Sequence, residues 1–386
     1  MSRFLDVCVV TGEESGDALA ASIIGALNAH SDAENPVALT GVGGDRLRAL
    51  GLRSLFPLSD IAVMGVTAVV ARLPLILRRI AATADHVVAR RPDLLLLVDS
   101  PDFTHRVAKR VRRADPSIPI IKVVSPSVWA WRPGRAKAMA PYVDHLLAIL
   151  PFEPKVHAQL GGPPCTYIGH PLIESVAELR DIRTPRDGSL LILPGSRSSE
   201  ISRHMALFGE VAQCLSARHP SLTFVLPAVP HMRSAIEAAA ATWDVPVRIV
   251  GPAEKHTAMR AATAALAASG TVTLELALAR VPMVVAYRLD PIVARLRWLS
   301  TISSIVLPNL ILERNAFPEF VHEAATAEAL TDALVPLLQD GSERTAQLRA
   351  ADEVAARLSR DAAPSEVAAR TILTHLKKRG PLPSGR

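Results

Sequence analysis

Short apolar runs recur along the chain, and each is followed by a polar or glycine-containing turn and then by a segment with helical spacing. Runs rich in Val, Ile and Leu predict strands at residues 5–10, 37–40, 94–98, 120–124 and 145–150. Residues 17–29 predict the helix that follows the first strand. Continuous apolar runs of this length are typical of parallel strands that are covered on both faces.

The same alternation returns after residues 178–188, a polar stretch with several Arg and Asp that is a candidate linker. The second series predicts strands at 190–193, 222–226, 247–250, 264–267 and 282–287, with helices between them. Alternating strands and helices favour a doubly wound parallel sheet. We therefore predict an α/β protein with two Rossmann-like, doubly wound domains, 1–180 and 189–325, that face a ligand cleft. A helical C-terminal segment, 326–379, is expected to pack across both domains.

Composition narrows the class of protein. The 386 residues exceed one ordinary core, and 49% hydrophobic with 21% charged residues excludes a disordered chain. The three cysteines, Cys8, Cys165 and Cys214, form no CxxC pair, which argues against a disulfide framework or a thiolate zinc site and favours a reducing cytosol. The first apolar run is short and interrupted by Asp6, so no signal peptide is predicted.

Charge and aromatic content bear on the partner. The formal net charge of +6 fits an anionic partner such as a nucleotide, a phosphosugar, an acidic lipid or a nucleic acid. Aromatic residues make up only 4%, so stacking platforms for single-stranded nucleic acid would be scarce. The histidines form no HExxH, which argues against a zinc protease, and no metal site is predicted.

Two loops in the second half combine glycine, hydroxyl groups and charge. Residues 193–200 read LPGSRSSE, so a predicted strand runs into Gly195, Ser196 and Arg197 and then into a helix that begins near Glu200. Backbone N–H groups and an arginine at a helix start suit a phosphate. An ordinary capped helix with an exposed arginine is the alternative.

The second of these loops, Ser269-Gly270-Thr271, opens a helix that carries Glu275 one turn on. A hydroxyl-rich helix start could bind a diphosphate, and a nearby carboxylate could accept both hydroxyls of a ribose. A helix cap followed by a surface glutamate is the alternative.

The first half offers a glycine loop and a pair of carboxylates. The first strand ends in TGEESGD, residues 11–17, where Gly12 and Gly16 permit a tight turn; the alternative is a helix capped by Ser15 or Asp17. Asp99 and Asp102 follow a buried strand, where a partly desolvated carboxylate could serve as a general base. One of the two is expected to be structural, most naturally Asp102 as a helix cap.

Two further segments suggest surface contacts. Residues 125–132 read SPSVWAWR, whose Trp and Arg could grip a sugar face, a base or a headgroup, or whose two Trp could pack internally. Residues 61–80 are strongly apolar but contain Arg72 and Pro74, so they make a poor spanning helix. Either an apolar face dipped into a membrane surface or a buried helix pair fits this stretch. A basic stripe, Arg106 to Arg113, could meet anionic lipid or simply be a solvated face.

Taken together, these segments resemble the lipid-A-disaccharide synthases, a family of bacterial glycosyltransferases. The resemblance runs from the first strand to about Glu313 and is carried by ten segments in order. They are TGEESGD (11–17), GVGGDRL (41–47), DSPDF (99–103), SPSVWAWR (125–132), LPFE (150–153), GHPL (169–172), LPGSR with SEI (193–201), SGTVTLE (269–275), PMVVAYR (282–288) and LPN (307–309). The first loop departs slightly, with Thr11 where the family commonly has Ala.

The resemblance implies the glycosyltransferase-B fold and an inverting transfer. The enzyme would move 2,3-diacylglucosamine from UDP onto 2,3-diacylglucosamine 1-phosphate, giving lipid A disaccharide 1-phosphate and UDP. Residues 1–180 would then be the acceptor- and membrane-facing domain, and 189–325 the UDP-sugar-binding domain. No cofactor is implied.

For such a reaction we assign roles to the residues described above and to Asn309 in the LPN segment. Asp99, or failing that Asp102, would be the base. The UDP-sugar would be held by Gly195, Ser196, Arg197, Glu200, Ser269, Gly270, Thr271, Glu275 and Asn309, with Arg197 stabilising the leaving diphosphate. The acceptor side or its loop would involve Gly12, Glu13, Ser15, Gly16, Asp17, Trp129 and Arg132.

The apolar stretch would receive acyl chains through Val66, Val69, Leu73 and Leu77. We therefore expect a cytoplasmic enzyme, peripheral on the inner face of the inner membrane, with no nucleic-acid partner; a homo-oligomer is possible. Another enzyme on the same scaffold, such as a UDP-N-acetylglucosamine 2-epimerase or a soluble sugar transferase, is the alternative. A basic nucleic-acid-binding protein is the rival from another class.

Overall fold

The computed structural model describes residues 5–30, 37–61, 66–180, 186–289 and 303–379. The side chains of residues 66–71 also lie outside the described part, and they include Val66 and Val69. Of the candidate linker, 178–188, residues 181–185 are outside it as well. The chain forms two compact units, one of Met1–Pro171 with Arg360–Arg386 and one of Leu172–Ser359.

The first unit is built on a seven-stranded parallel sheet in the order β3-β2-β1-β4-β5-β6-β7. Its central strand β4 is wholly apolar and fully buried, as expected for a strand covered on both faces. The strands are β1 (Asp6–Thr11), β2 (Ala38–Val42), β3 (Arg53–Ser54), β4 (Leu94–Val98), β5 (Ile120–Val123), β6 (His145–Ala148) and β7 (Cys165–Tyr167).

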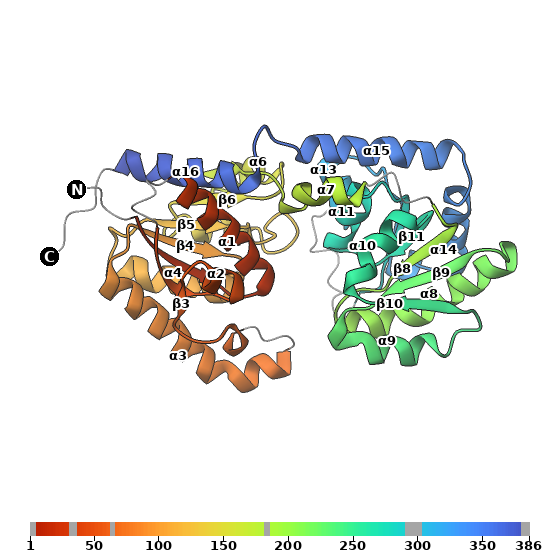
Figure 1. Cartoon of the computed structure of the whole chain (residues 1–386), viewed down its shortest axis with the longest axis horizontal. Helices are drawn as coiled ribbons and strands as arrows, with labels where there is room; N and C mark the ends of the chain where they lie inside the picture. Colours follow the sequence, from red (N-terminus) through yellow and green to blue (C-terminus); the bar gives the residue numbers. More distant parts are fainter. Residues whose placement is uncertain (1–4, 31–36, 62–65, 181–185, 290–302, 380–386) are drawn as a thin grey trace. The chain divides into compact units, whose positions relative to one another are not determined.

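Helices cover both faces of this sheet (Figure 1). They are α1 (Glu14–Ala29), α2 (Asp45–Ala49), α3 (Val66–Arg90), α4 (Pro101–Ala114), α5 (Gly134–Met139), α6 (Glu153–Gln159) and α16 (Pro364–Arg379). One apolar cluster joins the sheet to α1 and α16, and another joins it to α3 and α4. A hydrogen bond of 2.8 Å between His30 and Glu366 also ties α1 to α16, so the end of the chain belongs to the first unit.

The second unit has a six-stranded parallel sheet in the order β10-β9-β8-β11-β12-β13. Its strands are β8 (Ser189–Leu193), β9 (Thr223–Pro227), β10 (Val247–Val250), β11 (Ala264–Ala267), β12 (Met283–Tyr287) and β13 (Glu319–Val321). Its helices are α7 (Val176–Leu179), α8 (Ser198–Arg218), α9 (Arg233–Ala240), α10 (Pro252–Ala261), α11 (Thr271–Leu278), α13 (Leu307–Leu312), α14 (Ala327–Leu334) and α15 (Ser342–Leu358).

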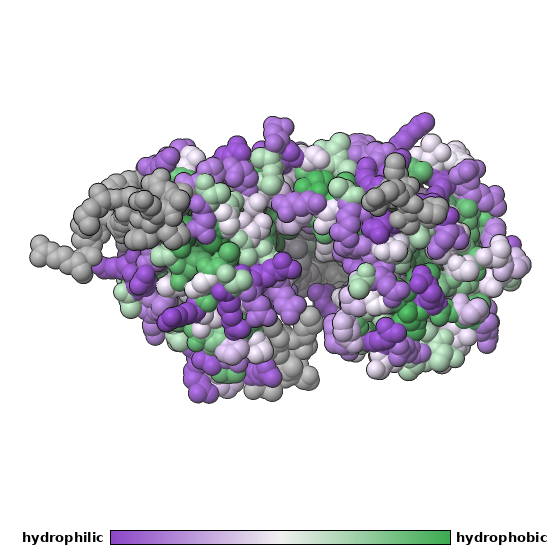
Figure 2. Space-filling model, in the orientation of Figure 1, coloured by the Kyte–Doolittle hydropathy of each residue, from purple (hydrophilic) through white to green (hydrophobic). Residues whose placement is uncertain are grey.

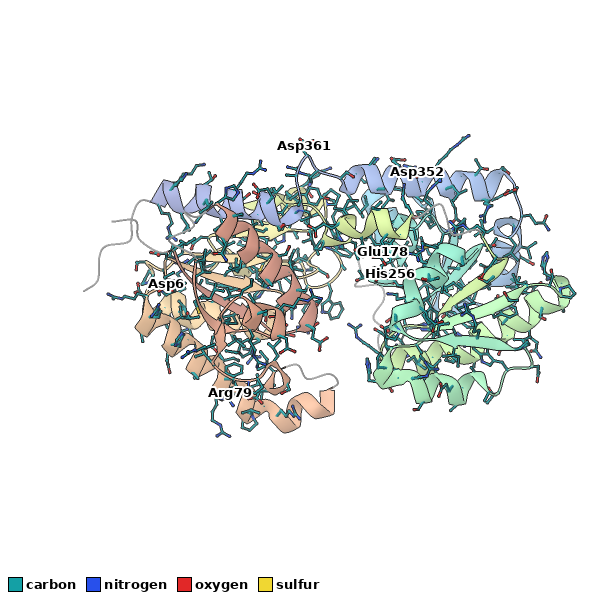
Figure 3. The ribbon with its side chains drawn as sticks, in the orientation of Figure 1. Asp6, Arg79, Glu178, His256, Asp352 and Asp361 are labelled. Atoms are coloured by element: carbon teal, nitrogen blue, oxygen red, sulfur yellow. The ribbon has the colours of Figure 1, made fainter. Side chains whose placement is uncertain are left out.

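An apolar cluster joins the second sheet to α8, α9 and α14. On the other side, α11 packs against α13 and α15. Polar contacts fix the outer helices: Glu178 on α7 and His256 on α10 lie 3.0 Å apart, and Asp352 on α15 pairs with Arg180 at 2.9 Å and Arg280 at 3.1 Å (Figure 3).

The predicted fold class is confirmed, since the two parallel sheets with flanking helices and the helical C-terminal segment are all present. The ten strands predicted from apolar runs appear within a residue or two of their expected ends. β3, β7 and β13 were not predicted, because two or three residues give no readable pattern.

Each sheet has a point where the strand order reverses, and this point determines where ligands can bind. In the first sheet it lies between β1 and β4, and in the second between β8 and β11. The register places Thr11 opposite Val98 and Leu193 opposite Ala267, so the loops that follow these strands begin side by side. Crevices outside the carboxyl ends at such a switch point are the usual ligand sites of open α/β sheets.

The apolar stretch near residue 70 is part of one long helix, α3, which continues through Pro74. In the described part of the chain, no helix combines the length and the apolar character needed to cross a bilayer. Leu73 and Leu77 on α3 are 41% and 45% exposed. Over the face in view in Figure 2, hydrophilic and hydrophobic residues are intermingled.

Candidate active site

A pocket of about 330 Å³ opens in the second unit at the switch point between β8 and β11. Volumes of this size hold small-molecule ligands. It brings together eight residues that the sequence proposed for a UDP-sugar: Gly195, Ser196, Arg197, Glu200, Ser269, Gly270, Thr271 and Glu275. The walls are completed by residues after β9 and at the start of α10. Two separate sequence motifs therefore converge on one site.

The loop after β8 needs glycine at Gly195. Its φ is +115°, and a Cβ there would lie 2.5 Å from Oε2 of Glu200. The carboxylate of Glu200 accepts hydrogen bonds from the backbone N–H groups of Ser196, at 3.0 Å, and Arg197, at 3.2 Å. The N–H groups that the sequence interpretation offered to a phosphate thus have an internal acceptor, and Glu200 organises the loop.

Arg197 brings a long, positively charged side chain to this pocket. Its guanidinium makes one ion pair with Glu200 at 3.2 Å, and the side chain is 67% exposed. A surface ion pair of this kind contributes at most about 1 kcal/mol. The guanidinium is therefore free to exchange that contact for a phosphate, which it can bind through two parallel hydrogen bonds.

The opposite wall is the start of α11. Gly270 has a φ of +140°, and the hydroxyl of Ser269 donates to the carbonyl of Ile305 at 2.6 Å, which fixes the turn. Thr271, the first residue of α11 at the positive end of the helix dipole, lines the pocket. The start of α11 can therefore donate hydrogen bonds to an anion, whereas the backbone N–H groups of Ser196 and Arg197 already bond to Glu200.

Glu275 is paired with a lysine that the sequence interpretation did not single out. Nζ of Lys255, on the first turn of α10, lies 2.5 Å from Oε2 of Glu275, and both residues line the pocket. The available signal was a lysine in the first turn of a helix that follows a strand end, a weak pattern by itself. The pair leaves the other carboxylate oxygen of Glu275 as an acceptor for a ligand hydroxyl.

Asn309 is not among the residues that line this pocket. It is buried on α13, where its amide donates to the carbonyl of Phe317 at 2.8 Å and accepts from the N–H groups of Ala316, at 3.0 Å, and Phe317, at 2.9 Å. These three bonds hold the turn that leads into β13. A contact of Asn309 with the sugar or the diphosphate stays a prediction.

The first unit has its own pocket, of about 320 Å³, at the carboxyl ends of β4 and β5. Asp99 is its carboxylate, and the other polar side chains are Ser125, Ser127, Trp131 and Arg135. A carboxylate, hydroxyls, an aromatic ring and a guanidinium form a surface suited to an anionic sugar.

Asp99 sits on a sharp turn between β4 and α4. Both Asp99, with a φ of +53°, and Ser100, with a φ of +41°, are in the left-handed region. Such residues cost on the order of 1–3 kcal/mol each and cluster at functional sites. The turn fits only because Gly12 lies against it: a Cβ on Gly12 would be 2.2 Å from Oγ of Ser100.

The backbone of Asp99 is held by β5 and α4. Its N–H donates to the carbonyl of Val123 at 3.1 Å, and its carbonyl accepts from Oγ1 of Thr104 at 2.9 Å and from Nζ of Lys122. Lys122 is fully buried, and this burial lowers the pKa of its amine from 10.5 to about 7, against the opposing effect of Asp99. A lysine inside a predicted strand was visible in the sequence, but its contact with Asp99 was not.

Asp102 is not among the residues that line this pocket. Its side chain is 88% exposed on α4, and Oδ1 accepts a long 3.4 Å contact from Arg135. The N-cap residue of α4 is Ser100, so Asp102 is not the helix cap that was expected. Of the two carboxylates that the sequence left open, Asp99 is the one that lines the pocket.

The loop at residues 11–17 divides into a structural and an exposed part. The buried carboxylate of Asp17 accepts from the N–H groups of Gly44 at 2.6 Å and Arg46 at 2.9 Å, which fixes the start of α2. Gly16 lies against Asp99, since a Cβ there would be 3.5 Å from Cβ of Asp99. Glu13 and Ser15 are exposed at the start of α1.

The two tryptophans of the SPSVWAWR segment have different surroundings. Trp129 packs edge-on against Phe152, and its Nε1 donates to Oε1 of Glu153 at 3.3 Å. Trp131 is 55% exposed and lines the pocket, with the guanidinium of Arg132 5.4 Å from its ring centre. Thus Trp131 and Arg135, rather than Trp129 and Arg132, line the cavity.

Ser125, which lines this pocket, belongs to a group of buried polar residues that also includes Glu153 and His157. Oγ of Ser125 lies 2.7 Å from Nε2 of His157, and Oε2 of Glu153 accepts from the N–H of Leu150 at 3.1 Å. Burial raises the pKa of Glu153 to about 7 and lowers that of His157. In the described residues, no group of three His, Cys, Asp or Glu side chains is arranged to hold a metal ion.

Solved structures with a similar fold include one bound to UDP and one bound to a UDP-sugar. A UDP-N-acetylglucosamine 2-epimerase from Neisseria meningitidis bound to UDP-GlcNAc has a TM-score of 0.61 at 13% identity, covering 97% of this chain and 100% of that one. The S. aureus MnaA–UDP co-structure has a TM-score of 0.62 at 13% identity, covering 99% of each chain. These likenesses establish the glycosyltransferase-B type of fold.

Sequence comparisons give the family. The family model described as Lipid-A-disaccharide synthetase matches residues 7–372. The lipid-A-disaccharide synthase of Nitrobacter hamburgensis is 49% identical, with 97% of each chain covered. The synthase of Rhodospirillum centenum is 41% identical, with 97% of this chain and 95% of that one covered. The chain belongs to the lipid-A-disaccharide synthase family.

Proposed function

We propose that this chain transfers 2,3-diacylglucosamine from its UDP derivative to 2,3-diacylglucosamine 1-phosphate, with inversion at the anomeric carbon. The observation that carries the proposal is the convergence of the Arg197 loop, the start of α11 and Glu275 on one pocket at the switch point of the second sheet. The membership of the family supplies the reaction class.

The second unit would hold the UDP-sugar. The diphosphate would lie at the start of α11, near Thr271, with Arg197 turning from Glu200 to bind it. The other carboxylate oxygen of Glu275 would accept from the ribose hydroxyls while Lys255 holds the carboxylate in place. As the bond between the anomeric carbon and the phosphate oxygen breaks, negative charge moves onto UDP. A guanidinium and a helix start stabilise that charge.

The first unit would hold the acceptor and supply the base. Asp99 would take the proton from the attacking hydroxyl of the acceptor while that oxygen forms the new bond to the anomeric carbon. The support is that Asp99 is the carboxylate of the first-unit pocket. Arg135 and Ser127 in the same pocket are suited to the phosphate of the acceptor. A single displacement of this kind inverts the anomeric centre.

We also propose a peripheral contact with the inner face of the cytoplasmic membrane, through α3. Both substrates carry acyl chains, and the exposed Leu73 and Leu77 lie one turn apart on this helix. A short apolar face with arginines beside it suits the headgroup boundary of an anionic membrane.

The direct test is to incubate the purified protein with UDP-2,3-diacylglucosamine and 2,3-diacylglucosamine 1-phosphate and to follow the products by mass spectrometry. We expect a disaccharide 1-phosphate and UDP in equal amounts. Interconversion of UDP-N-acetylglucosamine at its second carbon, with no disaccharide, would instead make the chain an epimerase.

A further inference from the structure

We propose that Lys122 is a positioning residue for the reaction, because its buried amine holds the backbone of Asp99 in the conformation that directs the carboxylate into its pocket. This inference rests on the proposed role of Asp99 as the base. Lys122 is not among the lining residues of either pocket, so the proposed role is an indirect one.

The contact is specific to the backbone turn at Asp99. Lys122 lies on β5, the strand next to β4, and in the register it is opposite Leu97. From there its side chain runs along the sheet to the carbonyl of Asp99, beyond the end of β4. Thr104 donates to the same carbonyl from α4. The carbonyl of the proposed base therefore has two donors, from two different elements.

A lysine at this buried position lowers the stability of the fold, which suggests that it is kept for a functional role. Lys122 is fully buried between Ile121 and Val123, which are also fully buried, in the middle of an apolar strand. Removing an amine from water disfavours its charged form, and an apolar side chain would fill a strand position at no such penalty. The amine can donate to a carbonyl in either protonation state, so the contact persists when the amine is neutral.

The charges around Lys122 are consistent with this role. Asp99 favours the charged form of the amine, while His105, on α4, has its pKa lowered by burial to about 3 and adds no positive charge at neutral pH. The amine is therefore directed toward Asp99 by both the hydrogen bond and the field.

The strained turn explains why a positioning residue is needed. Asp99 and Ser100 are both left-handed, a conformation that ordinary residues leave when nothing holds them. Misplacement of a catalytic group by about 1 Å can reduce turnover on the order of 10²-fold. Loss of the amine should thus affect turnover without affecting how either substrate binds.

The experiment compares Lys122→Met with the wild-type enzyme. Methionine keeps a flexible side chain of similar length and removes the donor. We expect kcat to fall roughly 10- to 100-fold, the KM values for both substrates and the affinity for UDP to stay within about twofold, and the melting temperature not to fall. Thr104→Val, which removes the second donor, should lower kcat less, and Lys122→Arg should restore part of the activity by restoring a donor.

Two comparisons separate positioning from a general packing defect. Thr83→Val removes a buried hydroxyl of α3 that bonds to the carbonyl of Arg79 at 2.7 Å rather than to the turn at Asp99, and it should leave kcat unchanged. In an Asp99→Asn background, Lys122→Met should cause no further loss, because a group that acts through Asp99 has nothing left to position.

The outcomes are distinct. The inference is overturned if Lys122→Met keeps the kcat of the wild type. It is also overturned if Lys122→Met lowers kcat by the same factor in the wild-type and the Asp99→Asn backgrounds. Either result leaves the proposed function intact. Wild-type kcat in Asp99→Asn would remove the proposed base itself. If Lys122→Met does not fold, Thr104→Val with the same double-variant comparison decides the question.

Discussion

The buried amine of Lys122 makes the stability of the first unit depend on pH, in a direction that can be derived. In the unfolded chain the amine has its ordinary pKa of 10.5, whereas burial lowers the folded value to about 7. Between these two values the unfolded state binds more protons than the folded state. The free energy of unfolding should therefore rise as the pH rises through this window, and below pH 7 the full burial penalty remains.

The magnitude follows from the same two values. Each pH unit inside the window changes the free energy of unfolding by up to about 1.4 kcal/mol. Between pH 7 and pH 9 the contribution of Lys122 is thus at most about 3 kcal/mol. Lys122→Met lacks this titration, so the stability advantage of the variant over the wild type should be largest near pH 6 and should shrink by that amount toward pH 9.

The assay is urea unfolding of both proteins at pH 6, 7, 8 and 9, followed by circular dichroism and by tryptophan fluorescence. Taking the difference between the proteins cancels the titration of groups that they share. Lys137→Met, which replaces an exposed lysine of α5, is the matched control and should track the wild type at every pH. A difference between Lys122→Met and wild type that stays constant from pH 6 to pH 9 would refute the reasoning.

Three further predictions concern the proposed reaction. Asp99→Asn should lower kcat by roughly 10²–10⁴ while UDP binding measured by calorimetry stays unchanged, and Asp102→Asn should remain near wild type; equal losses in both would contradict the assignment. Arg197→Ala should weaken UDP-sugar binding about tenfold or more, whereas Arg218→Ala, at the far end of α8, should not; unaltered donor affinity would discredit the phosphate site. Replacing Leu73 and Leu77 by Ser should release the protein from anionic vesicles in a flotation assay, and continued binding would place the membrane contact elsewhere.

The fold could be predicted because its main signals are local. Ten strands are continuous apolar runs, and a chain that alternates such runs with helical spacing has few arrangements other than a parallel sheet with helices on both faces. Ligands of open α/β sheets bind outside the carboxyl ends of the strands, and this rule predicts ligand sites at the loops that follow these strands. Eight of the residues proposed for the UDP-sugar line one pocket for this reason.

The remaining features of the candidate site depend on where individual side chains point, and the hydrophobic pattern of the sequence does not determine this. In the SPSVWAWR segment the turn geometry decides that Trp131 reaches the pocket while Trp129 packs on Phe152. Arg135 joins them from a short helix that has no distinguishing pattern. Lys122 interrupts an otherwise apolar strand, which was a readable signal, but only the sheet register shows that its amine reaches Asp99.

The Glu200 contact has a further consequence for where the diphosphate binds. The N–H groups of Ser196 and Arg197 can bond either to the carboxylate of Glu200 or to a phosphate, and a phosphate placed there would meet that buried carboxylate. Like charges in a partly buried site repel strongly. The phosphate is therefore expected at the start of α11, with the guanidinium of Arg197 as its counter-charge. Glu200→Gln should accordingly leave UDP affinity equal or higher, and a large loss of affinity in that variant would mean that Glu200 itself contacts the donor.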